Sequence, residues 1–397
     1  ITSTSLQVGA AVTITESGIE ASGIGITCAN INGGAIGGRR NILINGAMNV
    51  AQRGTAATTE QLYQTVDRMR LARSGCDENP SQQQATLTSA PGPYREGHRK
   101  AFKITNGNQT SGTGVTDTIG MSYRVEARDM RTSGWDYTST NSFITLQFWV
   151  KSSVAQTFYM RLRTVDGTSQ NYTMSYTVSA DTWTKVIRTI PGASNLQFDD
   201  DVNQGLQLNW FMFAGTNYTS SSMTLNSWAA YDVNSQSPDQ TTTWFTTNDA
   251  TWFITGIQLE VGTAATPFEH RTFGDELSLC QRYYCKSYNY GNAPGTNTIV
   301  GCRWGRNYSA EARSANPTSN CTFPVTMRSL PDLIFYSKTG TQGSWSKGAS
   351  NPGSSSTDDA VTGTYTTLSE NGFFAVSGLN PAAEHFFGGH FTAEAEI

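Results

Sequence analysis

Apolar and polar residues alternate with a period of two through residues 100–271, and this pattern constrains the fold most. Successive side chains of a β-strand point to opposite faces of a sheet, so this period predicts strands buried on one face. About eight such stretches, with turn signals roughly every ten residues, predict a two-sheet sandwich. The expected strands are residues 100–104, 121–127, 142–151, 156–164, 172–178, 182–190, 207–214 and 251–261.

The composition agrees with an all-β chain of more than one domain. A length of 397 residues suggests two or three domains, because one hydrophobic core rarely serves so long a chain. Only 15% of residues are charged, whereas 16 Tyr, 18 Phe and 9 Trp suit pleated sheets. The net charge of −4 offers no basic field, and no apolar run reaches membrane-spanning length. We therefore expect no nucleic-acid partner and no membrane insertion.

Residues 1–40 are small, β-branched and rich in Gly, and they alternate in short stretches. Ile14, Ile19 and Ile24 are spaced as in short strands, and linkers lack such residues. One copy buries little apolar area, so we expect a shaft or docking segment that intertwines with identical chains. A disordered linker is the alternative. The chain begins at Ile1 and not at Met, so we expect processing or a longer parent chain.

The remaining chain divides into four segments. Residues 41–94 are expected to be connecting loops and short strands, including a strand at 42–44 and a turn at Asn45-Gly46. Residues 95–272 form the sandwich. The apolar spacing then changes to that of a helix, which predicts a helical spacer over residues 273–286. Residues 287–397 are expected to form a C-terminal β-sandwich head, with strands at 296–301, 319–327, 332–337, 372–377 and 390–397.

No catalytic constellation stands out. None of the four histidines lies next to a nucleophile motif. Glu394 and Glu396 share one face of the last expected strand, as the paired carboxylates of a glycosidase would. We prefer to interpret them as a solvated or subunit-facing edge that discourages sheet aggregation. The chain is therefore not expected to be an enzyme.

The sequence contains two candidate metal sites, and neither matches a known metal-binding motif. His385 and His390 lie close to Glu384 in the sequence, but the spacing matches no zinc motif. Residues 199–205 begin with three aspartates, yet Gln204 stands where an EF-hand loop needs Gly. We expect neither metal nor cofactor, with a less regular calcium site as the alternative.

The cysteines are expected to be free buried thiols, as suits a reducing cytoplasm. They are Cys28, Cys76, Cys280, Cys285, Cys302 and Cys321.

Aromatic side chains beside polar turns are the best binding candidates, because sugar faces stack on flat rings. Tryptophans inside apolar strands are instead assigned to the core, namely Trp149, Trp183, Trp210 and Trp252. Packing against neighbouring subunits is the alternative role of the turn aromatics. These glycan-binding candidates are Trp135, Tyr137, Trp228, Tyr231, Trp244, Trp304, Tyr308 and Trp345.

Two islands of sequence carry a resemblance to a known group of proteins. The first covers residues 39–55 and reads Arg-Arg-Asn-Ile-Leu-Ile-Asn-Gly-Ala-Met-Asn-Val-Ala-Gln-Arg-Gly-Thr. The second runs from 254–262 through 266–271 to 279–284. Together they resemble tail-fibre and tail-appendage proteins of tailed bacteriophages, especially marine and cyanobacterial ones. The Phe-Trp-Val-Lys strand at 148–151 resembles that of jelly-roll carbohydrate-binding modules.

This resemblance implies a function in the virion. It implies a homotrimeric tail fibre or spike that is attached through its N-terminus to other tail or adaptor proteins and recognises host surface polysaccharide. A capsid or neck appendage with a purely structural role and a glycan depolymerase are the alternatives. It also suggests that Glu269, His270 and Arg271 form an ion-pair cluster at a joint between domains or subunits.

Overall fold

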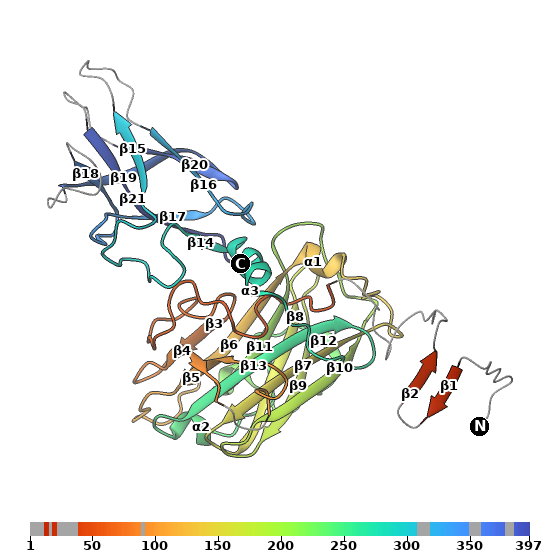
Figure 1. Ribbon diagram of the computed structural model, residues 1–397. Helices are drawn as coiled ribbons and strands as arrows, with labels where there is room; N and C mark the ends of the chain where they lie inside the picture. The colour runs from red at the N-terminus through yellow and green to blue at the C-terminus, as the bar shows by residue number, and fades with distance from the viewer. Residues whose placement is uncertain are drawn as a thin grey trace.

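The computed structural model describes residues 12–15, 18–21, 39–88, 92–307, 318–348, 359–377 and 385–397. The chain is mostly β, as expected (Figure 1). Strands β1 (Val12–Thr15) and β2 (Gly18–Ala21) pair as an antiparallel hairpin. The other strands expected in residues 1–38 lie outside the described residues. Short helices are α1 (Ala127–Arg131), α2 (Thr243–Thr246) and α3 (Phe273–Gln281), with one 3-10 turn, η1 (Thr216–Tyr218).

The central region is a sandwich of two antiparallel sheets. All eight expected strands are found within a few residues of their predicted ends. The five-stranded sheet has the order β10 (Thr184–Pro191), β7 (Phe143–Ser152), β13 (Thr251–Val261), β5 (Lys100–Thr105) and β4 (Ser81–Thr86). The six-stranded sheet has the order β12 (Trp228–Ala230), β9 (Gln170–Val178), β8 (Gln156–Thr164), β11 (Gln204–Ala214), β6 (Thr118–Glu126) and β3 (Arg70–Ser74).

One apolar core joins the two sheets. Phe148 of β7 meets Trp210 of β11 edge to face, with ring centroids 5.7 Å apart. Trp252 of β13 is also fully buried, so the assignment of Trp210 and Trp252 to the core is confirmed. Each such buried aromatic side chain stabilises the fold by roughly 2–3 kcal/mol.

Strand β4 replaces a loop expected around residues 81–84. Its sequence, Ser-Gln-Gln-Gln-Ala-Thr, has no apolar period, but Gln82 and Gln84 occupy buried positions. Gln82 donates to the carbonyl of Glu60 at 2.7 Å, and Gln84 donates to that of Met48 at 2.7 Å. Loops that fold over the sheet thus satisfy these amides, which is why a polar strand can be buried here.

The segment around Asn45 is a turn and not a strand. The turn expected at Asn45-Gly46 is confirmed, because Asn45 has a φ of 60° and its carbonyl accepts from the Met48 amide at 2.9 Å. The strand expected at 42–44 is wrong. The Asn41 side chain accepts from the backbone amide of Leu43 at 3.0 Å, which bends the chain there.

The C-terminal region is an eight-stranded sheet whose strands enclose a second core, including Trp345, Phe373 and Phe391. Four of its five expected strands are found, whereas residues 296–301 form none. The main path is β14 (Tyr284–Lys286), β21 (His385–Glu394), β18 (Ser344–Gly348), β19 (Asp359–Ser369), β20 (Gly372–Ser377) and β16 (Thr318–Thr322). Strands β15 (Arg303–Asn307) and β17 (Asp332–Tyr336) also pair with β21.

Helix α3 is shorter than the spacer expected over residues 273–286. It begins after Thr272, whose hydroxyl accepts from the Asp275 amide, and ends at Gln281. The next residues form β14, which pairs with the end of β21. Backbone pairing with the last strand therefore overrides the helical period after Gln281. Helix α3 and the C-terminus lie between the two β regions (Figure 1).

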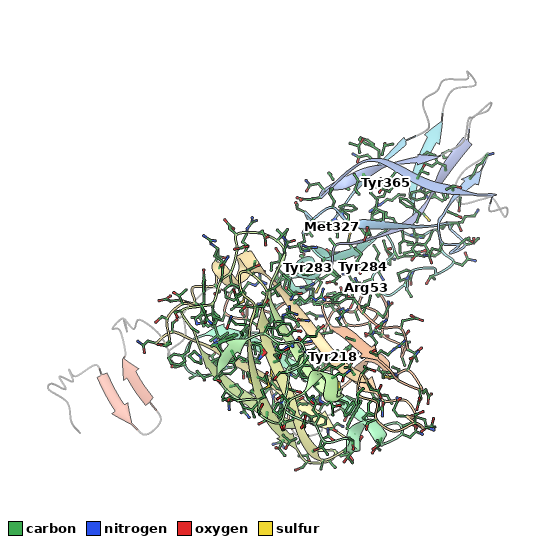
Figure 2. All side chains as sticks on the ribbon, turned by 180° about the vertical axis from the view of Figure 1, so that it is seen from behind. Arg53, Tyr218, Tyr283, Tyr284, Met327 and Tyr365 are labelled. Atoms are coloured by element: carbon green, nitrogen blue, oxygen red, sulfur yellow. The ribbon has the colours of Figure 1, made fainter. Side chains whose placement is uncertain are left out.

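The joint between the two β regions is built from stacked rings and buried ion pairs (Figure 2). The guanidinium carbon of Arg53 lies 3.7 Å from the ring centroid of Tyr284. Arg68 lies in the same way on Tyr283, at 3.5 Å. Both arginines form ion pairs with Glu396. Because these groups come from distant parts of the chain, they bind the C-terminal strand to the sandwich.

Glu394 and Glu396 therefore differ in environment. The side chain of Glu396 is only 4% exposed, so its expected place on a solvated or subunit-facing edge is wrong. Its charge is compensated by buried arginines within the same chain. The side chain of Glu394 is 45% exposed and lies 3.4 Å from Arg53.

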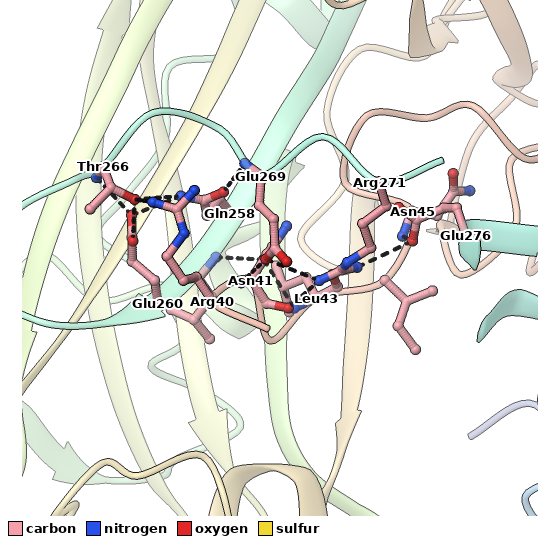
Figure 3. A network of polar contacts seen from close by, with 12 residues as sticks. Arg40, Asn41, Leu43, Asn45, Gln258, Glu260, Thr266, Glu269, Arg271 and Glu276 are labelled. Atoms are coloured by element: carbon pink, nitrogen blue, oxygen red, sulfur yellow. Dashed lines mark hydrogen bonds and ion pairs between the residues drawn. The ribbon is translucent and has the colours of Figure 1, made fainter. Parts of the chain in front are cut away.

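The two sequence islands meet along the second half of β13 (Figure 3). The side-chain oxygen of Asn41 accepts from the Leu259 amide, and its side-chain nitrogen donates to the Ile257 carbonyl, both at 3.0 Å. Asn41 thus acts as an additional pairing partner for β13. The two islands therefore contact each other within the folded chain, where the loop around Asn41 binds strand β13.

Part of the ion-pair cluster expected in the second island is present. Arg271 lies 3.4 Å from carboxylate oxygens of both Glu269 and Glu276 (Figure 3). His270 does not join it. Its Nε2 atom lies 2.7 Å from the carbonyl oxygen of Glu96.

Candidate functional site

The outward face of the five-stranded sheet carries a hollow of about 690 Å³ walled by aromatic rings. We call it the aromatic groove and define it by Tyr94, Trp149, Trp183 and Phe253. Its other lining residues are Thr86, Leu87, Thr88, Gly92, Pro93, Lys151, Asp181 and Thr182.

Strand alternation places these rings on the outward face. In β7, Phe148 and Val150 are buried in the core, so Trp149 between them points outward. In β13, Phe253 stands in the same way between two fully buried residues. Trp183 lies just before β10 and is half-buried. The assignment of Trp149 and Trp183 to the core is therefore wrong.

Glu96 fixes the orientation of Trp149. The indole N–H of Trp149 donates to a carboxylate oxygen of Glu96 at 2.9 Å. The ammonium of Lys185 donates to both oxygens of the same carboxylate at 3.0 Å. Partial burial alone would raise the pKa of Glu96, but these hydrogen bonds outweigh it and hold the pKa below its usual value.

The loop that carries Glu96 forms one wall of the groove. Gly92 has a φ of +95°, a left-handed conformation that favours glycine. A Cβ there would lie 3.0 Å from the Cβ of Trp183, so glycine also permits the loop to approach the ring. The guanidinium carbon of the exposed Arg99 lies 3.9 Å from the centroid of the Tyr94 ring.

A second hollow of about 420 Å³ adjoins the aromatic groove. The Glu96–Lys185 ion pair lines it and contacts Trp149 of the first hollow. Phe268 and His270 form its far side. The two hollows lie on either side of the Trp149–Glu96–Lys185 contacts, the first beside Trp149 and Lys151 of β7 and the second beside Lys185 and Ile187 of β10.

A buried histidine supports this second hollow. His98 is 1% exposed and meets Phe268 edge to face, with ring centroids 4.6 Å apart. Burial, together with the nearby His270 ring, lowers the pKa of His98 from 6.5 to about 4. The imidazole is therefore neutral at neutral pH and acts as a packing group under the groove.

The turn aromatics expected to bind glycan are not brought together. Three of them are buried in the cores and present no ring face to solvent, namely Trp135, Trp244 and Trp345. Tyr137 is half-buried against Phe198, and Trp304 is half-buried on β15. Tyr308 lies outside the described residues.

Two other candidates lie on the six-stranded sheet, away from the aromatic groove. Trp228 of β12 is half-buried and donates its indole N–H to the Pro191 carbonyl at 2.7 Å. Tyr231 is half-buried, with the guanidinium carbon of Arg163 3.7 Å from its ring centroid.

Two of the residues weighed for metal binding, His390 and Asp200, have other partners, whereas Glu384 and the side chain of His385 lie outside the described part of the chain. His390 stacks on Tyr288 with centroids 3.6 Å apart, and its ring nitrogens contact Ser287 and the Thr298 carbonyl. Asp200 pairs with Arg128 at 2.9 Å. Within the described ranges, no cluster of three or more metal-ligating side chains is found.

The cysteines differ in burial. Cys76, Cys280 and Cys285 are free; Cys280, Cys285 and Cys321 are buried, and Cys76 is half-buried. Cys28 lies outside the described residues. The helices in the described parts of the chain are too short and too polar to cross a bilayer.

No protein-family model and no curated protein matches the chain. Solved structures resemble it weakly. A tailspike domain from Bacteriophage CBA120, described as enzymatically active, is 9% identical over 56% of this chain and 21% of its own, with a TM-score of 0.30. A family 11 carbohydrate-binding module from Clostridium thermocellum, in complex with a mixed-linked tetrasaccharide, is 9% identical over 55% and 99%, with a TM-score of 0.25.

A cyclase from Fischerella sp. TAU is similar to the same degree, with 8% identity over 57% and 99% and a TM-score of 0.32. This chain therefore spans about a fifth of the tailspike chain but nearly all of the smaller proteins. Proteins with different activities appear at the same level of similarity. The similarity therefore does not identify a ligand for this chain.

Proposed function

We propose that the sandwich binds a polysaccharide chain in the aromatic groove. The observation that carries this proposal is the cluster of Trp149, Trp183 and Phe253 on the outward face of a sheet, in and beside a hollow of about 690 Å³. Rings this large normally pack inside a core, so partly exposed rings grouped in a concavity indicate a ligand with apolar faces.

The chemistry of the groove suits a sugar. The C–H face of a pyranose ring stacks on an indole, and each well-formed stack contributes on the order of 1 kcal/mol. Thr86, Thr88 and Asp181 line the same hollow and offer hydroxyl and carboxylate partners for sugar hydroxyls. The orientation of Trp149 is fixed before binding by Glu96, which reduces the entropy lost on binding.

We further propose that the protein is a phage tail fibre or spike that uses this groove for adsorption to the host surface, and that it binds without cutting the glycan. The resemblance of residues 39–55 and 254–284 to tail appendages supports this role. A trimer would hold three grooves, so weak individual sites would give strong overall attachment.

The test is affinity electrophoresis and a glycan array carrying bacterial surface polysaccharides. We expect the wild-type chain to bind at least one class of polysaccharide, and Trp149→Ala and Trp183→Ala each to weaken that binding. Tyr231→Ala, on the opposite sheet, is the matched control and should bind like wild type. Absence of binding across the array would favour a purely structural appendage. Release of new reducing ends from a bound polysaccharide would instead favour the depolymerase.

A further inference from the structure

The lysines of the sandwich are gathered on the sheet that carries the groove. In residues 39–272 they are Lys100, Lys103, Lys151 and Lys185. Two lie on β5, one on β7 and one on β10, all in the five-stranded sheet. The six-stranded sheet has none. The strands of the six-stranded sheet carry arginines instead, among them Arg161 and Arg163 of β8, so lysines occur on only one of the two sheets.

Phe253 lies between two of these lysines. It pairs in register with Lys103 on the neighbouring strand β5 and with Lys151 on the other neighbour, β7. Directly paired residues project from the same face of a sheet, so both lysines point outward with the ring. The ammonium nitrogens lie 5.6 and 4.6 Å from the centroid of Phe253, for Lys103 and Lys151 respectively.

These two lysines differ from Lys185 in their charge partners. Lys185 forms an ion pair with Glu96 at 3.0 Å. Neither Lys103 nor Lys151 forms an ion pair with any carboxylate in the described parts of the chain. Two cations without a carboxylate partner thus flank one aromatic ring, and an anionic ligand would supply their counter-charge.

Lys151 also lies beside the second ring of the groove, because its nitrogen is 5.7 Å from the Trp183 centroid. The Lys151 ammonium therefore lies over both rings, and a ligand that enters the groove meets this cation together with the aromatic surface. A carboxylate, sulfate or phosphate substituent on a stacked sugar would meet a charge-assisted donor there.

We propose that the groove selects an acidic polysaccharide, with Lys103 and Lys151 binding the anionic substituent while the aromatic rings hold the sugar face. This inference rests on the proposed function, since it names the class of glycan for the same groove. A neutral glycan would leave both ammonium groups without a counter-charge and is expected to bind more weakly.

The test uses the full chain on an array with matched neutral and acidic polysaccharides. Matched sets are β-1,4-mannan with β-1,4-mannuronan, and hydroxyethyl cellulose with β-1,4-glucuronan and cellulose sulfate. The variant is Lys103→Gln with Lys151→Gln. The control is Arg128→Gln with Arg131→Gln, which removes the same charge from the exposed face of α1.

We expect the hits to be acidic, and the lysine double variant to lose at least about tenfold in affinity while the α1 control binds like wild type. Raising the salt from about 0.05 M to about 0.5 M should weaken this binding. Carboxylate and sulfate members of the set identify which anion is selected. Circular dichroism and thermal unfolding verify that both variants fold.

Three outcomes would overturn the inference, and they are distinguishable. Neutral hits that need Trp149 but ignore the lysine substitutions would remove the inference and leave the proposed function intact. Acidic binding that needs the lysines but survives Trp149→Ala with Trp183→Ala would indicate a non-specific ion-exchange surface. No binding to any polysaccharide would contradict both the inference and the proposed function.

Discussion

Trp149 donates its indole N–H to Glu96 at 2.9 Å, and this hydrogen bond connects strand β7 to the loop that forms a wall of the groove on the outward face of its sheet. Glu96 in turn binds Lys185. One carboxylate thus fixes both the ring that a sugar would stack on and the cation beside it. The groove is organised before any ligand arrives.

Glu96→Ala should release the Trp149 ring without unfolding the protein. The indole N–H loses its acceptor, so we expect its proton NMR signal to shift upfield and its exchange with water to accelerate. Glu96→Gln keeps a side-chain oxygen and should preserve most of the shift. An unchanged Trp149 signal in Glu96→Ala would show that the hydrogen bond does not fix the ring.

His98 should make stability fall on mild acidification. Its pKa is about 4 in the folded protein and 6.5 in the reference state, so the unfolded chain binds more protons between these values. Stability from this group is complete above pH 6.5 and is lost towards pH 4, by about 3 kcal/mol in total.

The check is urea unfolding at pH 7 and at pH 4.5, compared between wild type and His98→Gln. Wild type should lose more of its free energy of unfolding than the variant does, because only wild type must retain a neutral imidazole. Equal losses in the two proteins would show that His98 titrates normally in the folded state.

Glu396 should be far more important for stability than Glu394, its neighbour on the same face. Glu396→Gln leaves the buried Arg68 without a carboxylate, which costs roughly 3–5 kcal/mol. Glu394→Gln removes a partner that is 45% exposed and should cost under about 1 kcal/mol.

Calorimetry measures both variants. We expect Glu396→Gln to separate the unfolding of the C-terminal region from that of the sandwich, since their joint is weakened. A single transition at the wild-type temperature would contradict the role assigned to the joint. A large loss in Glu394→Gln would contradict the difference between the two glutamates.

The homotrimer is tested by sedimentation equilibrium. We expect about three times the 43.1 kDa of one chain, and a smaller mass when residues 1–38 are deleted. The deletion stops before Arg40, whose side chain contacts Thr266 of the sandwich at 2.8 Å. A stable monomer with and without these residues would remove the intertwined shaft and its contribution to avidity.

The sequence predicts the sandwich well because alternation directly reports burial. Each of the eight expected strands is found, and residues 156–164 and 251–261 have their predicted bounds. The same alternation also held the signal for the groove. Within residues 142–151, Trp149 shares its parity with Gln147 and Lys151 and is therefore on the polar face. The apolar residues around Trp149 make the strand look uniformly apolar, which is why composition alone places this ring in the core.

Other features depend on contacts that no local pattern encodes. Strand β4 is buried through amides that bond loops distant in sequence, and helix α3 ends early because the following residues pair with β21. Trp244 has polar neighbours in the sequence, which indicate a turn, yet its ring is buried. Local polarity marks a turn but does not say whether the next ring folds inward.

The most direct test of the central claim is the affinity of the Trp149→Ala, Trp183→Ala double variant for the polysaccharide that wild type binds best in affinity electrophoresis. We predict a loss of at least about tenfold, from two lost stacks of on the order of 1 kcal/mol each, with Tyr231→Ala unchanged. Wild-type affinity in the folded double variant would contradict a binding role for the aromatic groove.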